Sequence, residues 1–292
     1  MKILDGKKTS LEIQNELGNK VKKLLEKGLK APHLAAVLVG DNGASRTYVN
    51  AKVKACERVG FKSTLHQLDA DTTQEELLSV VNQLNNDDAI DGFIVQLPLP
   101  EHIDEDQITL SINPNKDVDG FHPENVGKMT LGLPSFLPAT PNGIMEILKR
   151  YNIATEGKNT VVIGRSNIVG TPVSILMSRK SNPGNSTVTL AHSRTKNLKD
   201  ICLNADILIV AIGIPEFISA DMVKPNAVVI DVGIHRMEDS SKKSGFRLLG
   251  DVKFDEVSKI SSFITPVPGG VGPMTIASLL MNTYLACIEK NK

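Results

Sequence analysis

The stretch that most constrains the fold of this chain is VVIGRSNIVGTP, at residues 161–172. Its apolar run ends at Gly164, and a second glycine, Gly170, opens a segment that is compatible with a helix. This is the order of a strand that leads through a glycine turn to a helix N-terminus, where free backbone N–H groups and the helix dipole can hold a phosphate. Because the spacing departs from the G-x-G-x-x-G fingerprint, an ordinary strand-to-helix connection stays open beside a nucleotide site.

Short apolar runs alternate with longer amphipathic segments along most of the chain, which indicates parallel sheets with helices on both faces. The fold class is therefore α/β, with two α/β domains, the second a Rossmann-type doubly wound parallel sheet, and a ligand cleft between them. Strands are expected at residues 34–39, 61–68, 92–97, 160–164, 187–191, 206–212 and 227–232. Helices are expected at residues 10–27, 44–59, 73–86, 141–151, 170–180 and 274–290.

A break between the domains is expected at residues 113–142, which are rich in Pro, Gly and Asn and carry little apolar periodicity. It separates a first domain over residues 1–139 from a nucleotide domain over residues 140–272. The final helix, in residues 273–292, is expected to return to the first domain and complete it. Residues 236–249 are polar and predict an irregular surface excursion.

The composition excludes several classes of protein. Lys plus Arg and Asp plus Glu are equal at 33 each, so no global charge favours nucleic acid or an anionic membrane. Three widely spaced cysteines argue against a disulfide framework or a zinc site, and no metal site is expected. The N-terminus lacks an apolar signal core, and no window looks apolar enough to span a bilayer. We therefore expect a cytoplasmic protein that binds neither nucleic acid nor membrane.

Tyr48 and Lys52 are the first candidates for chemistry. They lie four residues apart in a predicted helix, so both side chains project from one face. An amine beside a phenol suits a site that moves a proton near an aromatic substrate, whereas the alternative is a solvated helix face. The same Y-x-x-x-K pattern occurs in short-chain dehydrogenases. In those enzymes the glycine loop comes before the Tyr and Lys in the sequence, whereas here it comes after Tyr48 and Lys52.

Two further candidates stand at the ends of predicted elements. Gln96 closes the strand GFIVQL, and ligands of parallel sheets bind beyond the carboxyl ends of strands. The segment KDVDGFHP contains Asp117 and Asp119 before a glycine. One of these acids could bind N–H groups of a ligand, or the segment could form a plain Asx turn. A calcium loop is disfavoured, since Val126 stands where such a loop needs a bidentate Glu.

Taken together, YVNAK, VQLPLP, KDVDGFHP, GRSNIVGTP and TPVPGGVGPMT, in this order, resemble the bifunctional methylenetetrahydrofolate dehydrogenase/methenyltetrahydrofolate cyclohydrolase family. The resemblance spans essentially the whole chain. It implies oxidation of 5,10-methylenetetrahydrofolate by NADP and hydrolysis of the methenyl product to 10-formyltetrahydrofolate in one cleft, as part of one-carbon metabolism. It also implies a homodimer whose small-molecule substrate is a reduced folate.

The resemblance further implies roles for individual residues. Lys52 is the catalytic lysine, Tyr48 packs against the folate, Gln96 supports Lys52 and Asp119 binds the pterin. The substrate site is expected to comprise Tyr48, Val49, Asn50, Ala51, Lys52, Val95, Gln96, Leu97, Asp119, Pro268, Gly269, Gly270, Val271 and Gly272. The cofactor site is expected to comprise Gly164, Arg165, Ser166, Ser193, Arg194 and Ile234.

The residues at the end of the second strand of the nucleotide domain also favour NADP as the cofactor. NAD-selective folds usually end their second strand in an acid that binds the ribose 2′-hydroxyl, whereas here that strand ends in His192, Ser193 and Arg194. For proton transfer, burial can lower the pKa of a lysine to about 7–8, so we expect Lys52 to be partly neutral. Three rival functions remain: a dehydrogenase without the hydrolase step, a two-domain dehydrogenase of the amino-acid or shikimate kind, and a non-catalytic folate or nucleotide carrier.

Overall fold

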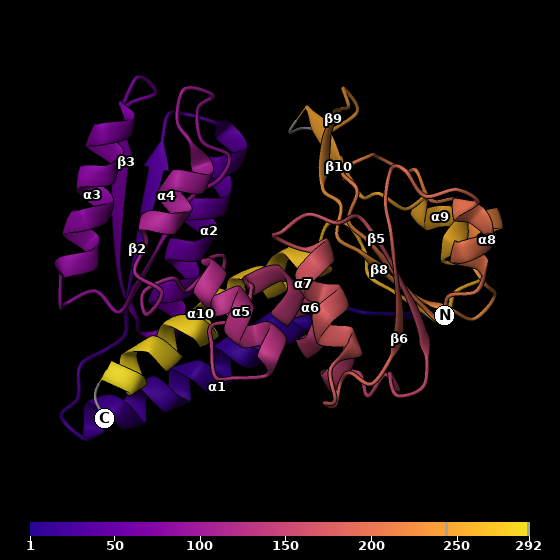
Figure 1. Cartoon of the computed structure of the whole chain (residues 1–292), viewed down its shortest axis with the longest axis horizontal. Coiled ribbons are helices and arrows are strands. Elements are labelled where there is room, and N and C mark those ends of the chain that lie inside the picture. Colours follow the sequence, from indigo (N-terminus) through magenta and orange to yellow (C-terminus); the bar gives the residue numbers. More distant parts are fainter. Residues whose placement is uncertain (243–244, 291–292) are drawn as a thin grey trace. The chain divides into compact units, whose positions relative to one another are not determined.

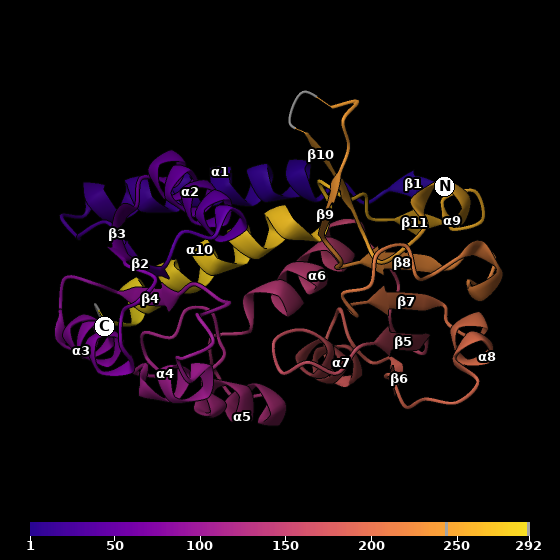
Figure 2. The ribbon, with the colours of Figure 1, turned by 90° about the horizontal axis from the view of Figure 1, so that it is seen from above.

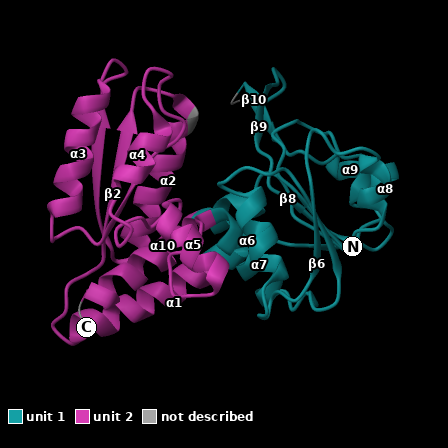
Figure 3. Cartoon of the chain, viewed as in Figure 1, with its two compact units in different colours: residues 1–10, 140–275 teal, residues 11–139, 276–292 magenta. Residues whose placement is uncertain are grey.

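The computed structural model describes residues 1–242 and 245–290 and divides the chain into two compact units (Figure 3). Unit 1 consists of Met1–Ser10 and Thr140–Thr275, and unit 2 consists of Leu11–Ala139 and the chain from Ile276 onward. Unit 1 corresponds to the expected nucleotide domain and unit 2 to the expected first domain. The first ten residues, which we expected in the first domain, belong to unit 1 instead. The reason is a two-residue parallel pairing, in which Lys2 lies opposite Phe263 and Ile3 opposite Ile264.

Unit 1 contains a six-stranded, wholly parallel sheet in the order β1-β11-β8-β7-β5-β6. Helices α6 and α7 lie on one side of it and α8 and α9 on the other (Figures 1 and 2), so the sheet is doubly wound as expected. Its strands are β1 (Lys2–Ile3), β5 (Asn159–Ile163), β6 (Thr187–Ala191), β7 (Ile207–Val210), β8 (Val228–Asp231) and β11 (Phe263–Ile264). Its helices are α6 (Ala139–Arg150), α7 (Gly170–Ser178), α8 (Leu198–Leu203), α9 (Phe254–Val257) and the 3₁₀ turn η1 (Ala220–Met222).

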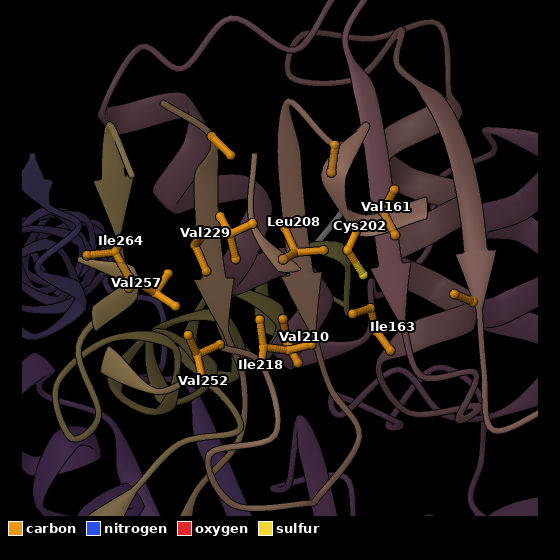
Figure 4. Close-up of a cluster of buried hydrophobic side chains, with 14 residues drawn as sticks. Val161, Ile163, Cys202, Leu208, Val210, Ile218, Val229, Val252, Val257 and Ile264 are labelled. Atoms are coloured by element: carbon orange, nitrogen blue, oxygen red, sulfur yellow. The ribbon is translucent and has the colours of Figure 1, made fainter. Parts of the chain in front are cut away.

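The core of unit 1 forms where alternate residues of the parallel strands meet helices α8 and α9 (Figure 4). Val161, Leu208 and Val229, from three neighbouring strands, are at most 3% exposed. Cys202 from α8 and Val257 from α9 pack against them. Because both faces of the sheet are covered, its central strands β5, β7 and β8 are nearly continuous apolar runs, and the sequence predicted all three.

Unit 2 is built on a smaller parallel sheet in the order β3-β2-β4. Helices α3 and α4 cover one face and α2 the other (Figure 2). The strands are β2 (His33–Val39), β3 (Lys62–Leu68) and β4 (Gly92–Val95). The helices are α2 (Gly43–Val59), α3 (Gln74–Asn86), α4 (Glu105–Ser111) and α5 (Pro123–Leu131).

Two long helices each begin in unit 1 and continue into unit 2: α1 (Gly6–Glu26) and α10 (Val271–Lys290). In α10, the amide of Asn282 donates to the carbonyls of Val118 and Leu137, which ties this helix into unit 2. The expectation that no segment is apolar enough to cross a bilayer was wrong for α10, which passes that test by length and composition. Buried core helices pass the same test, and 56% of this apolar window is buried within the protein.

Three expectations about local structure also need correction. Residues 236–249 are not irregular but carry an antiparallel hairpin of β9 (His235–Glu238) and β10 (Phe246–Leu249), two strands too short to show apolar alternation. The break at residues 113–142 contains helix α5, whose first residue is Pro123 and whose C-cap is Gly132. Helix α1 begins at Gly6, ahead of the expected start at residue 10.

The burial pattern of unit 2 predicts the effect of truncating Phe93, which is fully buried in β4. Phe93→Ala should lower the free energy of unfolding by about 3–5 kcal/mol, because it removes a large apolar side chain and leaves a cavity. Leu65→Ala, in β3, is the control, since Leu65 is 42% exposed. Urea unfolding of both variants tests this, and equal losses would show that the core of unit 2 is wrongly assigned.

Candidate functional site

Helix α2 places Tyr48 and Lys52 on one of its faces, as the spacing predicted. Lys52 is only 8% exposed, which is unusual for an ammonium group, and Tyr48 is half-buried. The Nζ of Lys52 donates a hydrogen bond to Oε1 of Gln96 at 3.1 Å. The solvated helix face that was the alternative is therefore excluded for Lys52.

Gln96 is held in one orientation by its own surroundings. It follows β4 directly, and its backbone N–H donates to the carbonyl of Val37 in the neighbouring strand at 2.9 Å. Its side-chain nitrogen donates to the carbonyl of Leu97 at 2.7 Å. The amide oxygen is left to face Lys52, so Gln96 can accept a hydrogen from the lysine amine whether that amine is charged or neutral.

The KDVDGFHP segment, which pairs with β4 through a bridge between Asp117 and Phe93, carries Asp119, whose charge acts on Lys52. Asp117 organises it, because one carboxylate oxygen accepts from the backbone N–H groups of Gly120 and Phe121, and the other from His122 N–H and the amide of Asn125. Burial raises the pKa of Asp117 to about 6. The two alternatives for KDVDGFHP thus apply to different acids: Asp117 forms the turn, and Asp119 is left available.

The charges of Lys52 and Asp119 act on each other. Burial lowers the pKa of Lys52, and the negative charge of Asp119 opposes that shift. Burial raises the pKa of Asp119, and the positive charge of Lys52 opposes that shift. Burial therefore favours the neutral form of Lys52 and the charge of Asp119 favours the protonated form, and an amine whose pKa is lowered gives up its proton more readily than an exposed lysine.

The other substrate residues predicted in unit 2 differ in how deeply they are buried. Val49 and Val95 are buried and pack in the core, so they support the site through shape. Ala51 and Leu97 are partly buried, and Asn50 is exposed. Burial raises the pKa of Tyr48, which keeps its phenol protonated and leaves the ring as an apolar surface.

In unit 1 the glycine turn forms at the point where strand order reverses. Taken in chain order, strands β5, β6, β7, β8 and β11 are arranged 2-1-3-4-5, with the reversal between β5 and β7. A Cβ at Gly164 would lie 2.1 Å from the carbonyl oxygen of Ala211, and one at Gly170 would lie 1.9 Å from that of Gly164. Only glycine fits at either position, which leaves the backbone bare beside the N-terminus of α7, as a pyrophosphate requires.

The residues expected to hold the adenosine end emerge beside this turn. Strands β5 and β6 are parallel neighbours, and the N–H of Gly164 donates to the carbonyl of Ala191 at 2.9 Å. Arg165 and Arg194 are both exposed at this edge, together with Ser193. The ring nitrogen Nδ1 of His192 accepts from the backbone of Arg194, which tightens the turn after β6. Ser166 is exposed as well, and its hydroxyl accepts from Val169 N–H at 3.1 Å, just before α7.

The remaining predicted residues, Ile234 and residues 268–272, also belong to unit 1. Ile234 is 45% exposed in the turn after β8. In the PVPGGVG segment, Pro268 and Gly272 are exposed, whereas Gly270 and Val271 are buried. The carbonyl of Gly269 accepts from the N–H of Lys7 at 2.9 Å, which anchors this segment on the start of α1.

Among the residues that the structure describes, no group of three or more His, Cys, Asp or Glu side chains could hold a metal ion. The three cysteines, Cys56, Cys202 and Cys287, are all buried free thiols. The sequence reasoning missed one organising residue, Asp117, which it left as one of two equal acids. The signal that separates the two is position: Asp117 pairs with Phe93 of β4 in an isolated bridge, so it is fixed to the sheet.

Comparison with protein families gives two matches that together cover nearly the whole chain. The model of the tetrahydrofolate dehydrogenase/cyclohydrolase catalytic domain matches residues 4–119. The model of the tetrahydrofolate dehydrogenase/cyclohydrolase NAD(P)-binding domain matches residues 138–291.

Individual proteins are similar over the full length. Bifunctional protein FolD of Cytophaga hutchinsonii is 66% identical over 290 residues, covering 99% of this chain and 100% of the relative. The crystal structure of the bifunctional FolD methylenetetrahydrofolate dehydrogenase/cyclohydrolase from Campylobacter jejuni has a TM-score of 0.92 and 51% identity, and covers 99% of each chain. The Trypanosoma brucei FolD structure, in complex with NADP and an inhibitor, has a TM-score of 0.93 and 39% identity, and covers 99% of this chain and 97% of that one.

Proposed function

Since this chain belongs to the tetrahydrofolate dehydrogenase/cyclohydrolase family, we propose that it oxidises 5,10-methylenetetrahydrofolate with NADP and hydrolyses the product to 10-formyltetrahydrofolate. The observation that carries the proposal is the buried amine of Lys52, held by Gln96 and facing the charge of Asp119. We further propose that one folate-binding cluster around Lys52 serves both reactions.

The oxidation step asks little of the protein in the way of acid or base. NADP, when bound, accepts a hydride from the methylene carbon of the folate. That carbon is flanked by two nitrogens, so the product is a resonance-stabilised cation. The chain must mainly orient the folate ring and keep water out. Tyr48 and Asp119 are placed for the first task, through the apolar face of the phenol and a carboxylate that accepts pterin N–H groups.

The hydrolysis step needs proton movement. Water adds to the methenyl carbon and loses one proton, which a neutral Lys52 can accept. As the formyl carbonyl forms, the hydroxyl loses its remaining proton and the departing ring nitrogen gains one, which the ammonium form of Lys52 can supply, so that one proton is released to solvent overall. Gln96 holds the amine so that its lone pair points away from the amide oxygen. The negative charge of Asp119 opposes the lowering of the Lys52 pKa by burial and so favours the protonated amine.

The cofactor site supports NADP through its positive charge. Arg165 and Arg194 are exposed beside the glycine turn, and no acid follows β6 to bind a ribose 2′-hydroxyl. Guanidinium groups make charge-assisted, often bidentate, hydrogen bonds to phosphates. The matching domain model is described as NAD(P)-binding, and the Trypanosoma brucei relative was solved with NADP.

One assay tests the proposal against its rivals. The protein is incubated with methylenetetrahydrofolate and NADP while reduced cofactor and methenyl-folate are followed together. Formation of reduced cofactor followed by decay of methenyl-folate supports both activities. A carrier would give no absorbance change, a dehydrogenase alone would accumulate methenyl-folate at the uncatalysed decay rate, and a shikimate-type enzyme would turn over only a different substrate.

Replacing Lys52 should separate the two reactions from cofactor binding. Lys52→Met should lower the cyclohydrolase rate by at least about a hundredfold, because it removes the proton-transferring group. The affinity for NADP, measured by titration, should stay unchanged. Lys54→Met is the control, since Lys54 is exposed on the same helix. Wild-type hydrolysis by Lys52→Met would refute the role of the lysine.

Removing the charge of Asp119 should shift the pH dependence of hydrolysis. The reaction needs the free amine, so the rate at saturating folate falls as pH drops through the pKa of Lys52. Asp119 raises that pKa, so Asp119→Asn should lower it and move the acid limb of the profile to lower pH. Asp106→Asn, an exposed acid of α4, should leave the limb in place. An acid limb that stays fixed, or moves to higher pH, in Asp119→Asn would contradict the coupling.

Truncating Arg165 should distinguish the two nicotinamide cofactors. A charge-assisted bond to the 2′-phosphate is worth about 1.5–3 kcal/mol, so Arg165→Ala should weaken NADP by roughly ten- to a hundredfold. NAD lacks that phosphate and should bind Arg165→Ala as well as wild type. Lys180→Ala supplies a second exposed cation of unit 1 as the control. Equal loss for NADP and NAD would rule out recognition of the 2′-phosphate by Arg165.

We also propose, on the family resemblance, that the enzyme is a cytoplasmic homodimer associating through its nucleotide-binding units. Free thiols at all three cysteines agree with a reducing compartment. The equal numbers of acidic and basic residues agree with a small-molecule enzyme that has no nucleic-acid partner.

A further inference from the structure

The turns that follow β7 and β8 are fixed by buried carboxylates. After β7, the backbone N–H groups of Ile212 and Gly213 donate to Oδ2 of Asp251, at 2.8 and 3.1 Å. Asp251 is fully buried and comes from the far end of the β9–β10 hairpin. An acid distant in sequence therefore holds the turn at the carboxyl end of β7.

Asp231, the last residue of β8, completes the arrangement. Its Oδ1 accepts from the N–H groups of Gly233 and Asp251, both at 2.9 Å, and its Oδ2 accepts from Val252 N–H at 3.0 Å. Asp231 is 3% exposed. It joins the turn after β8 to the segment that carries Asp251, so the two turns share one hydrogen-bonded support.

The turn after β8 also lies directly on Asp251. A Cβ at Gly233 would come within 2.4 Å of the Asp251 carboxylate, so no side chain fits there. The carboxylate and the backbone of this turn are therefore in contact, and a displacement of one displaces the other.

His235 supplies the remaining contact of Asp251. Its Nε2 lies 2.7 Å from Oδ1 of Asp251, and its side chain is 17% exposed. Since the Asp251 oxygens accept from two backbone N–H groups and act as a carboxylate, Nε2 of His235 is the donor in this pair. His235 is thus joined through a charge-assisted bond to the acid that holds the turn after β7, while it follows the turn after β8 directly.

The two supported turns present apolar side chains at this edge of the sheet. Ile214, just after the β7 turn, is 49% exposed, and Ile234, in the β8 turn, is 45% exposed. Exposed apolar side chains on a rigid backbone at the carboxyl end of parallel strands suit the face of a flat ring. Ile234 is also the residue that we expect beside the cofactor.

We propose that His235 and Asp251 are positioning residues for the nicotinamide end of NADP, because they lock the two turns that carry Ile214 and Ile234. This inference rests on the proposed function, since it takes the cofactor site to be at this edge. Both residues belong to unit 1, whereas Lys52, Gln96 and Asp119 belong to unit 2, so we expect the pair to set cofactor affinity and to leave folate chemistry unaffected. The hydrogen-bond donor of His235 is the required property, and its charge is secondary.

The test compares two substitutions of His235. His235→Leu removes the donor and leaves Asp251 one partner short, and we expect the KM for NADP to rise about tenfold, which corresponds to about 1.4 kcal/mol. His235→Gln carries an amide N–H that can reach the same oxygen, and we expect its KM for NADP to stay within about twofold of wild type. Met237→Ala, an exposed side chain of the same strand, is the control.

The hydrolysis of added methenyl-folate, measured without any nicotinamide, separates positioning from loss of structure. It should be unchanged in His235→Leu, as should the KM for the folate. The proposal is overturned if the KM for NADP is unaffected in His235→Leu, if both activities fall together, or if His235→Gln is as impaired as His235→Leu. Where His235→Leu does not fold, titration of NADP into Asp251→Asn and His235→Gln decides, since the first should bind more weakly than the second. Failure of the wild type to catalyse either reaction would refute the proposed function instead, before any variant is compared.

Discussion

The parallel direction of the strands is the constraint on which both units depend. In a parallel sheet every strand ends at the same edge, so the segments that follow neighbouring strands come together however far apart they are in sequence. In unit 1 this gathers the turns after β5, β6, β7 and β8 at one edge. In unit 2 it places Gln96, after β4, where the lysine of α2 can reach it. Gln96 and the turns of unit 1 therefore get their positions from strand ends, whereas Tyr48 and Lys52 get theirs from helix α2.

Burying an amine has a cost that the surroundings of Lys52 only partly offset. A fully desolvated ammonium is strongly disfavoured, and a single amide acceptor such as Gln96 does not replace its hydration. The charge of Asp119 returns part of the lost stabilisation. The net effect is a lowered pKa, which makes the amine a better proton acceptor for hydrolysis than an exposed lysine would be. An exposed lysine at the same position would hold its proton throughout, so burial is the feature that makes this residue useful.

The sequence predicts most of the elements, because strands buried on both faces are continuous apolar runs and their helices are amphipathic. It fails where an element is too short to show a period. The two-residue strand at Lys2–Ile3 is fixed by pairing with β11, and no local signal marks it. The strands of the hairpin, β9 and β10, are only four residues long each, and their register comes from pairing with each other. Of the site, the sequence locates Tyr48, Lys52, Gln96 and Asp119, but the burial of Lys52 depends on packing that no spacing reveals.

Buried carboxylates are the second recurring device of this structure, and their roles follow from what they accept. Asp117, Asp231 and Asp251 each accept from two or more backbone N–H groups. Asp251 and Asp231 fix the turns that follow β7 and β8, and Asp117 fixes the turn that begins at its bridge to Phe93. Burial raises the pKa of both Asp117 and Asp231 to about 6, so their hydrogen bonds only partly offset desolvation. Asp119 differs because its main electrostatic partner is an amine. An acid whose acceptor sites are filled by backbone can only hold structure, whereas an acid that faces an amine can still bind a ligand. The same residue type therefore serves as a support in three places and as a candidate binding group in the fourth, and the number of backbone donors around the carboxylate distinguishes the two uses.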